Sequence, residues 1–308
     1  MAGEDASIVV PATSANLGCG FDCAGLAVNL YLKVRGRLGR SGEFRCRYQG
    51  PGAELVPLDS SNLIARAALA AARRAGAGIA GGEIEIENEI PMARGLGSSA
   101  AAIVAGILLV ARHLDRPLDA ELVLELAAEL EGHPDNIAAA LHGGMVVSAQ
   151  DAQGKIRFAR ATLPADLDFI AVVPDRELST ERARGVLPAS YARQDAVANL
   201  QRLSLLVATC FSGKFQIDPE LFLDRLHQPY RAPLVPGLEA CFELRHPDLL
   251  GVFLSGAGSS VMAMARRNAA EIGERLAEQF TRRGVGARVL LLKAENRGAL
   301  DFFEGSVA

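Results

Sequence analysis

Three glycine-bearing segments contain the residues whose types and spacing could carry chemistry. The most informative reads PMARGLGSSA, from Pro91 to Ala100, and it places Gly95 and Gly97 directly before Ser98 and Ser99. Glycine lets a backbone approach a ligand closely, and the apolar run after the serines predicts a helix that begins at Ser98. A helix N-terminus offers unpaired N–H groups to an anion, so the segment predicts a phosphate-binding turn. A bare Gly-x-Gly-Ser-Ser fits an ordinary capped turn equally well.

The other two segments add polar groups to the same pattern. LSGAGSSV, from Leu254 to Val261, lies between two expected strands and supplies Gly256 and Gly258. TSANLGCGFD follows the first expected strand and places Asn16 and Asp22 just beyond it. Each segment alone could be a tight turn with a packing role, but three such loops in one chain favour a ligand site.

Known phosphate motifs and several protein classes do not fit the chain. No lysine follows Gly97, as a P-loop requires, and the strand context of a dinucleotide fingerprint is missing. The net charge of -4 argues against nucleic-acid binding, although a few arginines suffice for one small anion. The longest apolar run, Ala100 to Ala111, is shorter than the ~20 residues that span a bilayer. The acidic N-terminus lacks a signal core, so we expect a cytoplasmic protein.

The five cysteines predict reduced, unreactive thiols. They are scattered along the 308 residues, and the pair Cys19 and Cys23 has no second pair with which to form a zinc site.

Hydrophobic patterning predicts an α+β protein. EIEIENEI, from Glu83 to Ile90, alternates acids with isoleucine, as a half-buried strand does. Strands are expected at Ser7–Val10, Leu26–Val34, Glu43–Tyr48, Glu83–Ile90, Gly144–Ala149, Ile156–Arg160, Phe169–Val173, Leu250–Ser255, Val261–Ala265 and Ala287–Lys293. Helices are expected at Asn62–Ala75, Ser98–His113, Ala120–Leu130, Thr180–Gly185, Ala196–Cys210 and Ala269–Gln279. Strands and helices do not alternate strictly, so antiparallel pairing is expected, with a domain break in the polar stretch Ala149–Gly154 that gives domains 1–153 and 154–308.

Together, these segments resemble the signature motifs of the GHMP kinases, a superfamily that includes galactokinase, homoserine kinase and mevalonate kinase. PMARGLGSSAAA is similar to the central phosphate-binding motif, and LSGAGSSV to the C-terminal glycine motif. Within the superfamily, PATSANLGCGFDCAGLAV and EGHPDNIAAALHGG resemble the homoserine kinases, in order and spacing over nearly the whole chain. Cys19 stands where proline is usual, and GAGSS where GSGPS is commoner, but neither departure removes a charged or ligating group.

The resemblance implies ATP-dependent phosphorylation of the L-homoserine hydroxyl, with Mg²⁺, to give O-phospho-L-homoserine and ADP for threonine biosynthesis. It implies two α+β domains with the site between them, the first like domain 2 of ribosomal protein S5 and the second ferredoxin-like. A dimer is usual for the family. Two alternatives stay open, which are another GHMP kinase with a different hydroxyl acceptor and a non-catalytic ligand sensor of the same fold.

The resemblance also implies residues for the nucleotide and the metal. Asn62 matches a position that contacts adenine, although the residue alone is typical of a helix N-cap. Glu129 with Ser98 or Ser99 would hold Mg²⁺, and Glu131 is a rival for the carboxylate. The rest of the nucleotide site would be Pro91, Arg94, Gly95, Leu96, Gly97, Ser98, Ser99, Ala100, Gly256 and Gly258.

The substrate carboxylate calls for arginine, whose planar fork can bind both oxygens. By the resemblance these arginines are Arg184 and Arg231, and Thr180 lies one helical turn before Arg184. Asn16 and Asp22 would meet the amino and hydroxyl ends of the substrate.

A final cluster, His133, Asp135 and Asn136, follows the helix that carries Glu129. Relatives with a proposed catalytic base have aspartate where this chain has Asn136, and an amide cannot accept the proton. The resemblance therefore implies catalysis without a conventional base, through orientation and charge stabilisation.

Overall fold

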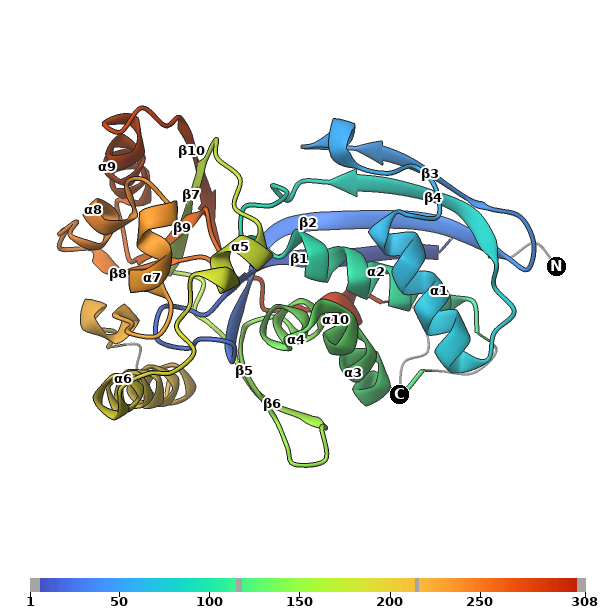
Figure 1. Cartoon of the computed structure of the whole chain (residues 1–308), viewed down its shortest axis with the longest axis horizontal. Coiled ribbons are helices and arrows are strands. Elements are labelled where there is room, and N and C mark those ends of the chain that lie inside the picture. The colour runs from blue at the N-terminus through green and yellow to red at the C-terminus, as the bar shows by residue number, and fades with distance from the viewer. Residues whose placement is uncertain (1–5, 115–117, 214–215, 304–308) are drawn as a thin grey trace.

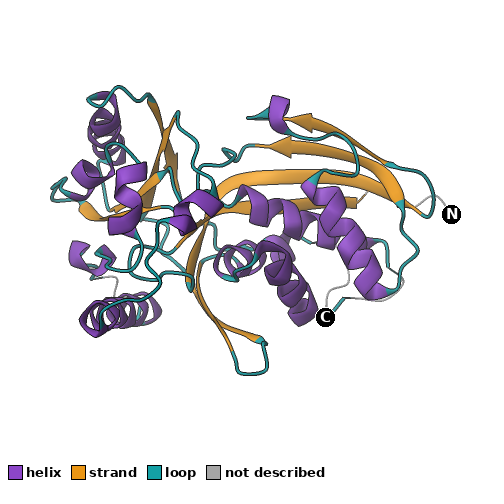
Figure 2. Ribbon diagram, viewed as in Figure 1, coloured by secondary structure: helices purple, strands orange, loops and turns teal. Residues whose placement is uncertain are grey.

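Each of the two sheets in the computed structural model carries helices on one face (Figure 1, Figure 2). The structure describes residues 6–114, 118–213 and 216–303. Within these residues, the first sheet has the strand order β3-β4-β2-β5-β6, with β1 also paired to β2. Its strands are β1 Ala6–Ala15, β2 Ala24–Gly39, β3 Phe44–Gln49, β4 Gly81–Asn88, β5 Met145–Gln150 and β6 Ile156–Ala161. Its helices are α1 Leu63–Ala75, α2 Ser98–Arg112, α3 Ala120–Glu131 and α4 Asp135–His142, with a 3₁₀ turn at Ala53–Leu55.

Side-chain patterning explains how these elements pack. In β4, Glu83 and Glu85 are exposed whereas Ile84 and Ile86 are buried, as the alternating sequence predicts. Helix α2 is buried from Ala100 to Ala111 on nearly every side, because α1 and α3 pack against it. At Gly106 a Cβ would lie 2.3 Å from the Ile64 carbonyl oxygen, so a glycine is needed where α1 and α2 meet.

The second domain has the ferredoxin-like arrangement. Its strands are β7 Asp168–Pro174, β8 Leu249–Leu254, β9 Val261–Ala265 and β10 Ala287–Leu292, all antiparallel in the order β10-β7-β9-β8. Its helices are α5 Thr180–Gly185, α6 Arg193–Phe211, α7 Gln228–Arg231, α8 Leu238–Phe242 and α9 Ala269–Thr281, with 3₁₀ turns at Pro219–Phe222 and Ala232–Leu234. The α+β class is confirmed, and so is antiparallel pairing, except that β3 runs parallel to β4.

The expected domain break is displaced in the structure. Residues 151–155 form the turn of the hairpin that joins β5 to β6, and Asp151 N–H donates to the Lys155 carbonyl at 2.8 Å. Because β6 belongs to the first sheet, the chain enters the second domain between β6 and β7. It later returns, and α10 (Ala299–Phe302) packs on β1 and α4. The division at 153/154 therefore does not separate the two sheets.

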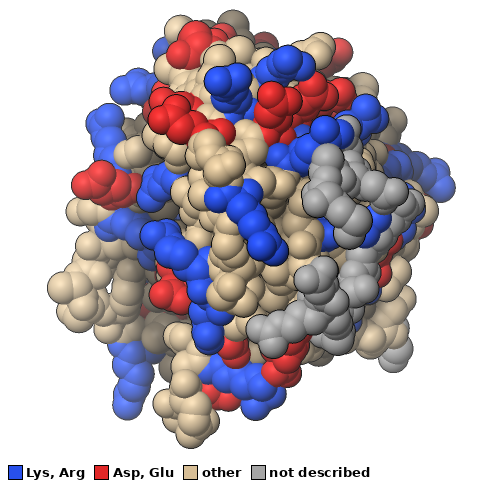
Figure 3. Space-filling view, turned by 90° about the vertical axis from the view of Figure 1, so that its right-hand side faces the viewer, with Lys and Arg blue, Asp and Glu red and all other residues tan. Residues whose placement is uncertain are grey.

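The surface carries charges of both signs. On the face shown in Figure 3, acidic side chains lie among the lysines and arginines. Among the described residues, no helix combines the length and the hydrophobicity needed to cross a membrane. All five cysteines are free thiols, and burial raises the pKa of Cys19 to about 12 and that of Cys23 to about 11, so neither is a thiolate at neutral pH.

Candidate active site

The three glycine loops meet where the two domains join. Ser255 Oγ donates to the Gly95 carbonyl at 2.6 Å, which joins the C-terminal loop to the central one. Gly256 N–H donates to the Ala15 carbonyl at 3.0 Å, and Asn16 Nδ2 donates to the Gly256 carbonyl at 2.8 Å. The C-terminal loop, which lies more than 150 residues from either of the other two in the sequence, thus forms one hydrogen-bonded unit with them.

The central loop delivers the N-terminus of α2 to this unit. Gly97 precedes the helix at φ +72°, and a Cβ there would lie 1.9 Å from Thr13 Oγ1. Gly95 has φ +77°, and a Cβ there would lie 2.1 Å from the Ser255 carbonyl oxygen. Both glycines are therefore required by backbone conformation and by packing. The free N–H groups at the start of α2 suit an anion.

A cavity of about 160 Å³ lies in front of this helix end and brings most of the predicted residues together. The predicted residues that line it are Asn16, Asp22, Pro91, Arg94, Gly95, Leu96, Gly97, Ser98, Ser99, His133, Asp135, Asn136, Thr180, Arg184, Arg231, Gly256 and Gly258.

Asn62 and Ala100 do not line the cavity. Asn62 is the N-cap of α1, where its Oδ1 accepts from Ile64 N–H at 2.9 Å and its Nδ2 donates to the Pro57 carbonyl at 2.8 Å. Both polar groups of this amide are used within the protein. Ala100 is buried inside α2, one residue beyond the polar end.

Two arginines with different surroundings face the cavity. The half-exposed Arg184 forms a two-pronged pair with Asp22, with Nη2 at 2.7 Å from Oδ1 and Nη1 at 3.1 Å from Oδ2, and this carboxylate raises the pKa of Arg184. Arg231 is only 2% exposed, and burial and the charge of Arg184 lower its pKa to about 10. The sequence did not reveal that Phe21 lies beside both, with its ring centroid 5.9 Å from Arg184 Cζ and 5.3 Å from Arg231 Cζ.

Acidic and amide groups also line the cavity. His133 Nδ1 lies 2.7 Å from Asp135 Oδ1. Burial disfavours the charged form of His133, but the hydrogen bond and charge of Asp135, with the charge of Glu131, outweigh it and raise the pKa of His133. Asn136 Oδ1 accepts from Thr13 Oγ1 at 2.8 Å, which fixes this amide beside the central loop.

Known proteins are similar to nearly the whole chain. The model of the GHMP kinases N terminal domain matches residues 62–144, and that of the GHMP kinases C terminal matches residues 214–282. The homoserine kinase of Solibacter usitatus is 43% identical over 289 residues, which cover 94% of each chain. The chain belongs to the GHMP kinase family. The homoserine kinase of Deinococcus radiodurans is also 43% identical, over 92% of each chain. The crystal structure of homoserine kinase from Cytophaga hutchinsonii, 29% identical, matches with a TM-score of 0.84 over 96% of each chain.

In this GHMP kinase, Glu131 and not Glu129 faces the cavity. Ser99 Oγ donates to Glu131 Oε2 at 2.7 Å. Burial raises the pKa of Glu131, although the hydrogen bond from Ser99 and the charge of His133 act to lower it. Glu129 is exposed and lies outside the cavity lining. Two residues of helix correspond to a rotation of about 200°, so these two glutamates cannot share one side of α3. The family motif alone does not separate them.

A larger cavity of this GHMP kinase, about 500 Å³, is lined only by residues of the second domain. It is lined by residues such as Phe222, Phe242 and Val252, and none of the three glycine loops reaches it. The convergence of a helix N-terminus, two arginines and a serine–glutamate pair marks the smaller cavity as the candidate active site, because size alone supplies no chemistry.

Proposed function

We propose that this enzyme transfers the γ-phosphoryl group of ATP to the side-chain hydroxyl of L-homoserine. The observation that carries the proposal is that the start of α2 and two arginines face one cavity, so a phosphate site and a carboxylate site are adjacent. In the reaction the hydroxyl oxygen bonds to the γ-phosphorus and the bond from that phosphorus to the bridging oxygen breaks. ADP and O-phospho-L-homoserine form, and the hydroxyl proton is released.

The triphosphate would lie along residues 95–99, where the N–H groups of the helix end meet its negative charge. A third cavity, of about 310 Å³, shares Pro91 and Arg94 with the candidate active site and is also lined by Leu55 and Met92. We expect the adenine there, because it continues directly from the phosphate site and offers apolar side chains. Asn62 would then act on the nucleotide only through the position of α1.

The residues present fit Mg²⁺. Ser99 Oγ and Glu131 Oε2 are oxygen donors 2.7 Å apart. The described residues contain no cluster of three or more His, Cys, Asp or Glu side chains that could hold a metal. Two protein oxygens supplemented by phosphate oxygens are what Mg²⁺ prefers, whereas a dedicated cage is not. A bound Mg²⁺ would neutralise charge on the β- and γ-phosphates.

The acceptor would bind in the cavity between the two arginines and the acidic residues Glu131 and Asp135. Arg184 and Arg231 carry the positive charge that a substrate carboxylate needs, and Asp22 offers negative charge to the ammonium group. Asn16 contributes indirectly, because its Oδ1 accepts from Asp22 N–H at 3.0 Å and its Nδ2 is bound to the Gly256 carbonyl.

Proton acceptance by a side chain has little structural support. Asn136 is an amide, and Asp135 Oδ1 already accepts from Asn136 N–H at 2.7 Å and contacts His133. Catalysis therefore rests on alignment of the hydroxyl and on stabilisation of the γ-phosphoryl charge.

Product identity tests the proposal. Incubation with Mg-ATP and L-homoserine should give one new phosphomonoester by ³¹P NMR, with the mass of O-phosphohomoserine. ATP that binds without any such product would favour a ligand sensor, and a phosphomonoester only from other acceptors would favour a different GHMP kinase activity. The homodimer and the cytoplasmic location stay predictions.

A further inference from the structure

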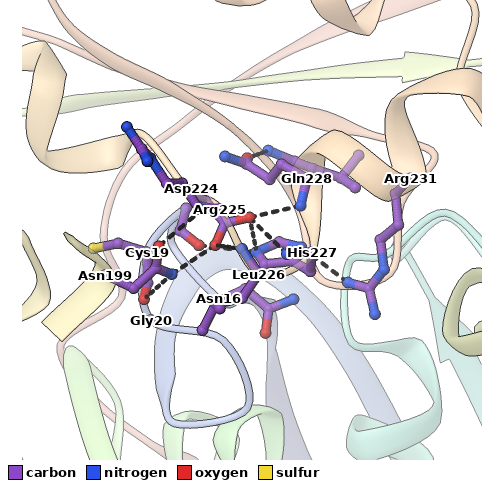
Figure 4. A network of polar contacts seen from close by, with 12 residues as sticks. Asn16, Cys19, Gly20, Asn199, Asp224, Arg225, Leu226, His227, Gln228 and Arg231 are labelled. Atoms are coloured by element: carbon purple, nitrogen blue, oxygen red, sulfur yellow. Dashed lines mark hydrogen bonds and ion pairs between the residues drawn. The ribbon is translucent and has the colours of Figure 1, made fainter. Parts of the chain in front are cut away.

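A buried polar network joins the turn before α7 to Asn199 and to the first glycine-bearing loop (Figure 4). At its centre, the fully buried carboxylate of Asp224 accepts from Asn199 Nδ2 at 2.6 Å. It also accepts from the backbone N–H groups of Leu226, His227 and Gln228, at 2.9, 2.8 and 2.6 Å. Four donors on one carboxylate fix the turn from Asp224 to Gln228, which leads into α7.

The network also reaches the first glycine-bearing loop. Asn199 Nδ2 donates to the Cys19 carbonyl at 3.1 Å. His227 Nε2 donates to the Gly18 carbonyl at 2.8 Å. A Cβ at Gly18, where φ is +72°, would lie 2.1 Å from the Phe222 carbonyl oxygen, so only glycine permits this close approach. The loop that carries Phe21 and Asp22 is thereby attached to the second domain.

His227 connects this network to Arg231. Arg231 Nη1 lies 3.1 Å from His227 Nδ1, and because a guanidinium only donates, Nδ1 must accept. A carbonyl only accepts, so Nε2 carries the hydrogen and the ring is the neutral Nε2–H tautomer. Burial, with the charge of Arg231, lowers the pKa of His227 to about 4 against the opposing charge of Asp224. The ring also stacks on Phe21, with centroids 5.0 Å apart.

The remaining contacts of Arg231 define its orientation. Its Nε donates to the Ala183 carbonyl at 3.1 Å, and Nη1 also donates to the Gly256 carbonyl at 3.1 Å. These bonds and the bond to His227 occupy Nε and Nη1. Nη2 has no hydrogen bond to another described side chain or carbonyl, so it is the donor left for a ligand in the cavity that Arg231 lines.

We propose that His227 is a positioning residue that sets the orientation of Arg231 and so determines how strongly the enzyme selects an acceptor with a carboxylate. This role rests on the proposed function. His227 lies behind the site and is not part of the cavity lining. Its acceptor nitrogen holds Nη1 of the guanidinium and leaves Nη2 for the substrate, and Asp224 fixes the backbone of His227 by accepting from its N–H.

The test compares His227→Phe with His227→Gln. Phenylalanine can keep the stacking on Phe21 but removes both the Nδ1 acceptor for Arg231 and the Nε2–H donor to the Gly18 carbonyl, whereas glutamine keeps a carbonyl acceptor. Loss of one charge-assisted hydrogen bond should lower kcat/KM for L-homoserine by about ten- to a hundredfold in His227→Phe, with less loss in His227→Gln. The KM for ATP should stay within about twofold, because the start of α2 is not part of the network. For 3-aminopropan-1-ol, which lacks the carboxylate, kcat/KM in His227→Phe should also stay within about twofold of the wild-type value.

A double-mutant cycle with Arg231→Lys separates positioning from general damage. If His227 acts through Arg231, His227→Phe should have less than about a threefold further effect on kcat/KM once Arg231 is replaced. Independent, multiplying effects would overturn the proposal, as would equal rises in KM for ATP and homoserine. A kcat/KM for L-homoserine that is no higher in His227→Gln than in His227→Phe would also overturn the proposal.

A second readout does not need catalysis. The ¹⁵N NMR signal of Arg231 Nε–H, identified by its loss in Arg231→Lys, should shift and exchange faster with water in His227→Phe. An unchanged signal would overturn the positioning role. Wild-type enzyme that makes no O-phosphohomoserine would instead contradict the proposed function, and the NMR comparison would still decide the positioning role.

Discussion

Replacing Gly95 with alanine tests whether the contact between two glycine loops holds the phosphate site in shape. A Cβ at this position would lie 2.1 Å from the Ser255 carbonyl oxygen and 2.9 Å from the Gly258 carbonyl oxygen. Both contacts are to backbone, so no flexible side chain can move aside. The C-terminal loop would have to shift away from the start of α2, and the anion site would open.

The cost has two separable parts. Holding alanine at the φ of +77° that Gly95 adopts costs about 1–2 kcal/mol. Forcing extra volume into a packed site adds about 1–3 kcal/mol. Gly284 supplies the matched control, because its φ is +72° and no atom lies within 4 Å of its Cβ position. Gly284→Ala should therefore show only the first cost, about 1–2 kcal/mol, and Gly95→Ala about 2–5 kcal/mol in all.

Urea unfolding measures both costs, and steady-state kinetics with varied ATP measures the function. Gly95→Ala should lose more stability than Gly284→Ala and should raise the KM for ATP at least about tenfold, whereas Gly284→Ala leaves that KM unchanged. Equal losses of stability in the two variants, with an unaltered KM for ATP in Gly95→Ala, would refute the claim that this contact shapes the nucleotide site.

Three further predictions concern the metal, the substrate and pH. Glu131→Gln should raise the Mg²⁺ concentration for half-maximal rate at least about tenfold, and Glu129→Gln should not, as Mg²⁺ titration of the rate would show. Arg184→Gln should raise the KM for homoserine by about ten- to a hundredfold in steady-state assays, because a charged donor is lost. The pKa of His227 is lowered from 6.5 to about 4, so the unfolded chain binds the proton first as pH falls. Between pH 7.5 and 5, wild type should lose about 2 kcal/mol of unfolding free energy more than His227→Phe, measured in urea.

Each of these has a distinct contrary result. An equal dependence of the rate on Mg²⁺ in Glu131→Gln and Glu129→Gln would show that Glu131 does not bind the metal. An Arg184→Gln enzyme with a normal KM for homoserine would show that the carboxylate binds elsewhere. Parallel pH profiles for wild type and His227→Phe would mean that His227 titrates alike in both states.

Local patterns predicted most of the fold because their signals lie within single elements. The alternation in Glu83–Ile90 and the apolar run after Ser98 each identified an element whose type the structure confirms. Helix α4, by contrast, is absent from the helices that the sequence predicted. Its residues from Asp135 to Leu141 are all buried, so it has no polar face to reveal a helical period. The domain break was misplaced because a polar hairpin turn has the same composition as a linker.

The candidate site was likewise predictable only where the pattern lies within a short segment. The glycine motifs predicted the cavity, because a left-handed backbone conformation favours glycine at single positions of such a segment. Contacts between residues distant in the sequence left no pattern from which they could be predicted. The pairing of Arg184 with Asp22 spans 162 residues, and the bond from His227 to Gly18 spans 209. The separation of Glu131 from Glu129 depends on which side of α3 faces the cavity, and only the packed helix shows it.

Steady-state ADP release with Mg-ATP and a panel of acceptors tests the central claim most directly. The panel is L-homoserine, L-serine, L-threonine, mevalonate and galactose. We predict turnover confined to L-homoserine, with loss of that selectivity when Arg231 is replaced. Turnover of mevalonate or galactose in preference to homoserine, or ATP binding with no turnover of any of the five, would contradict the account.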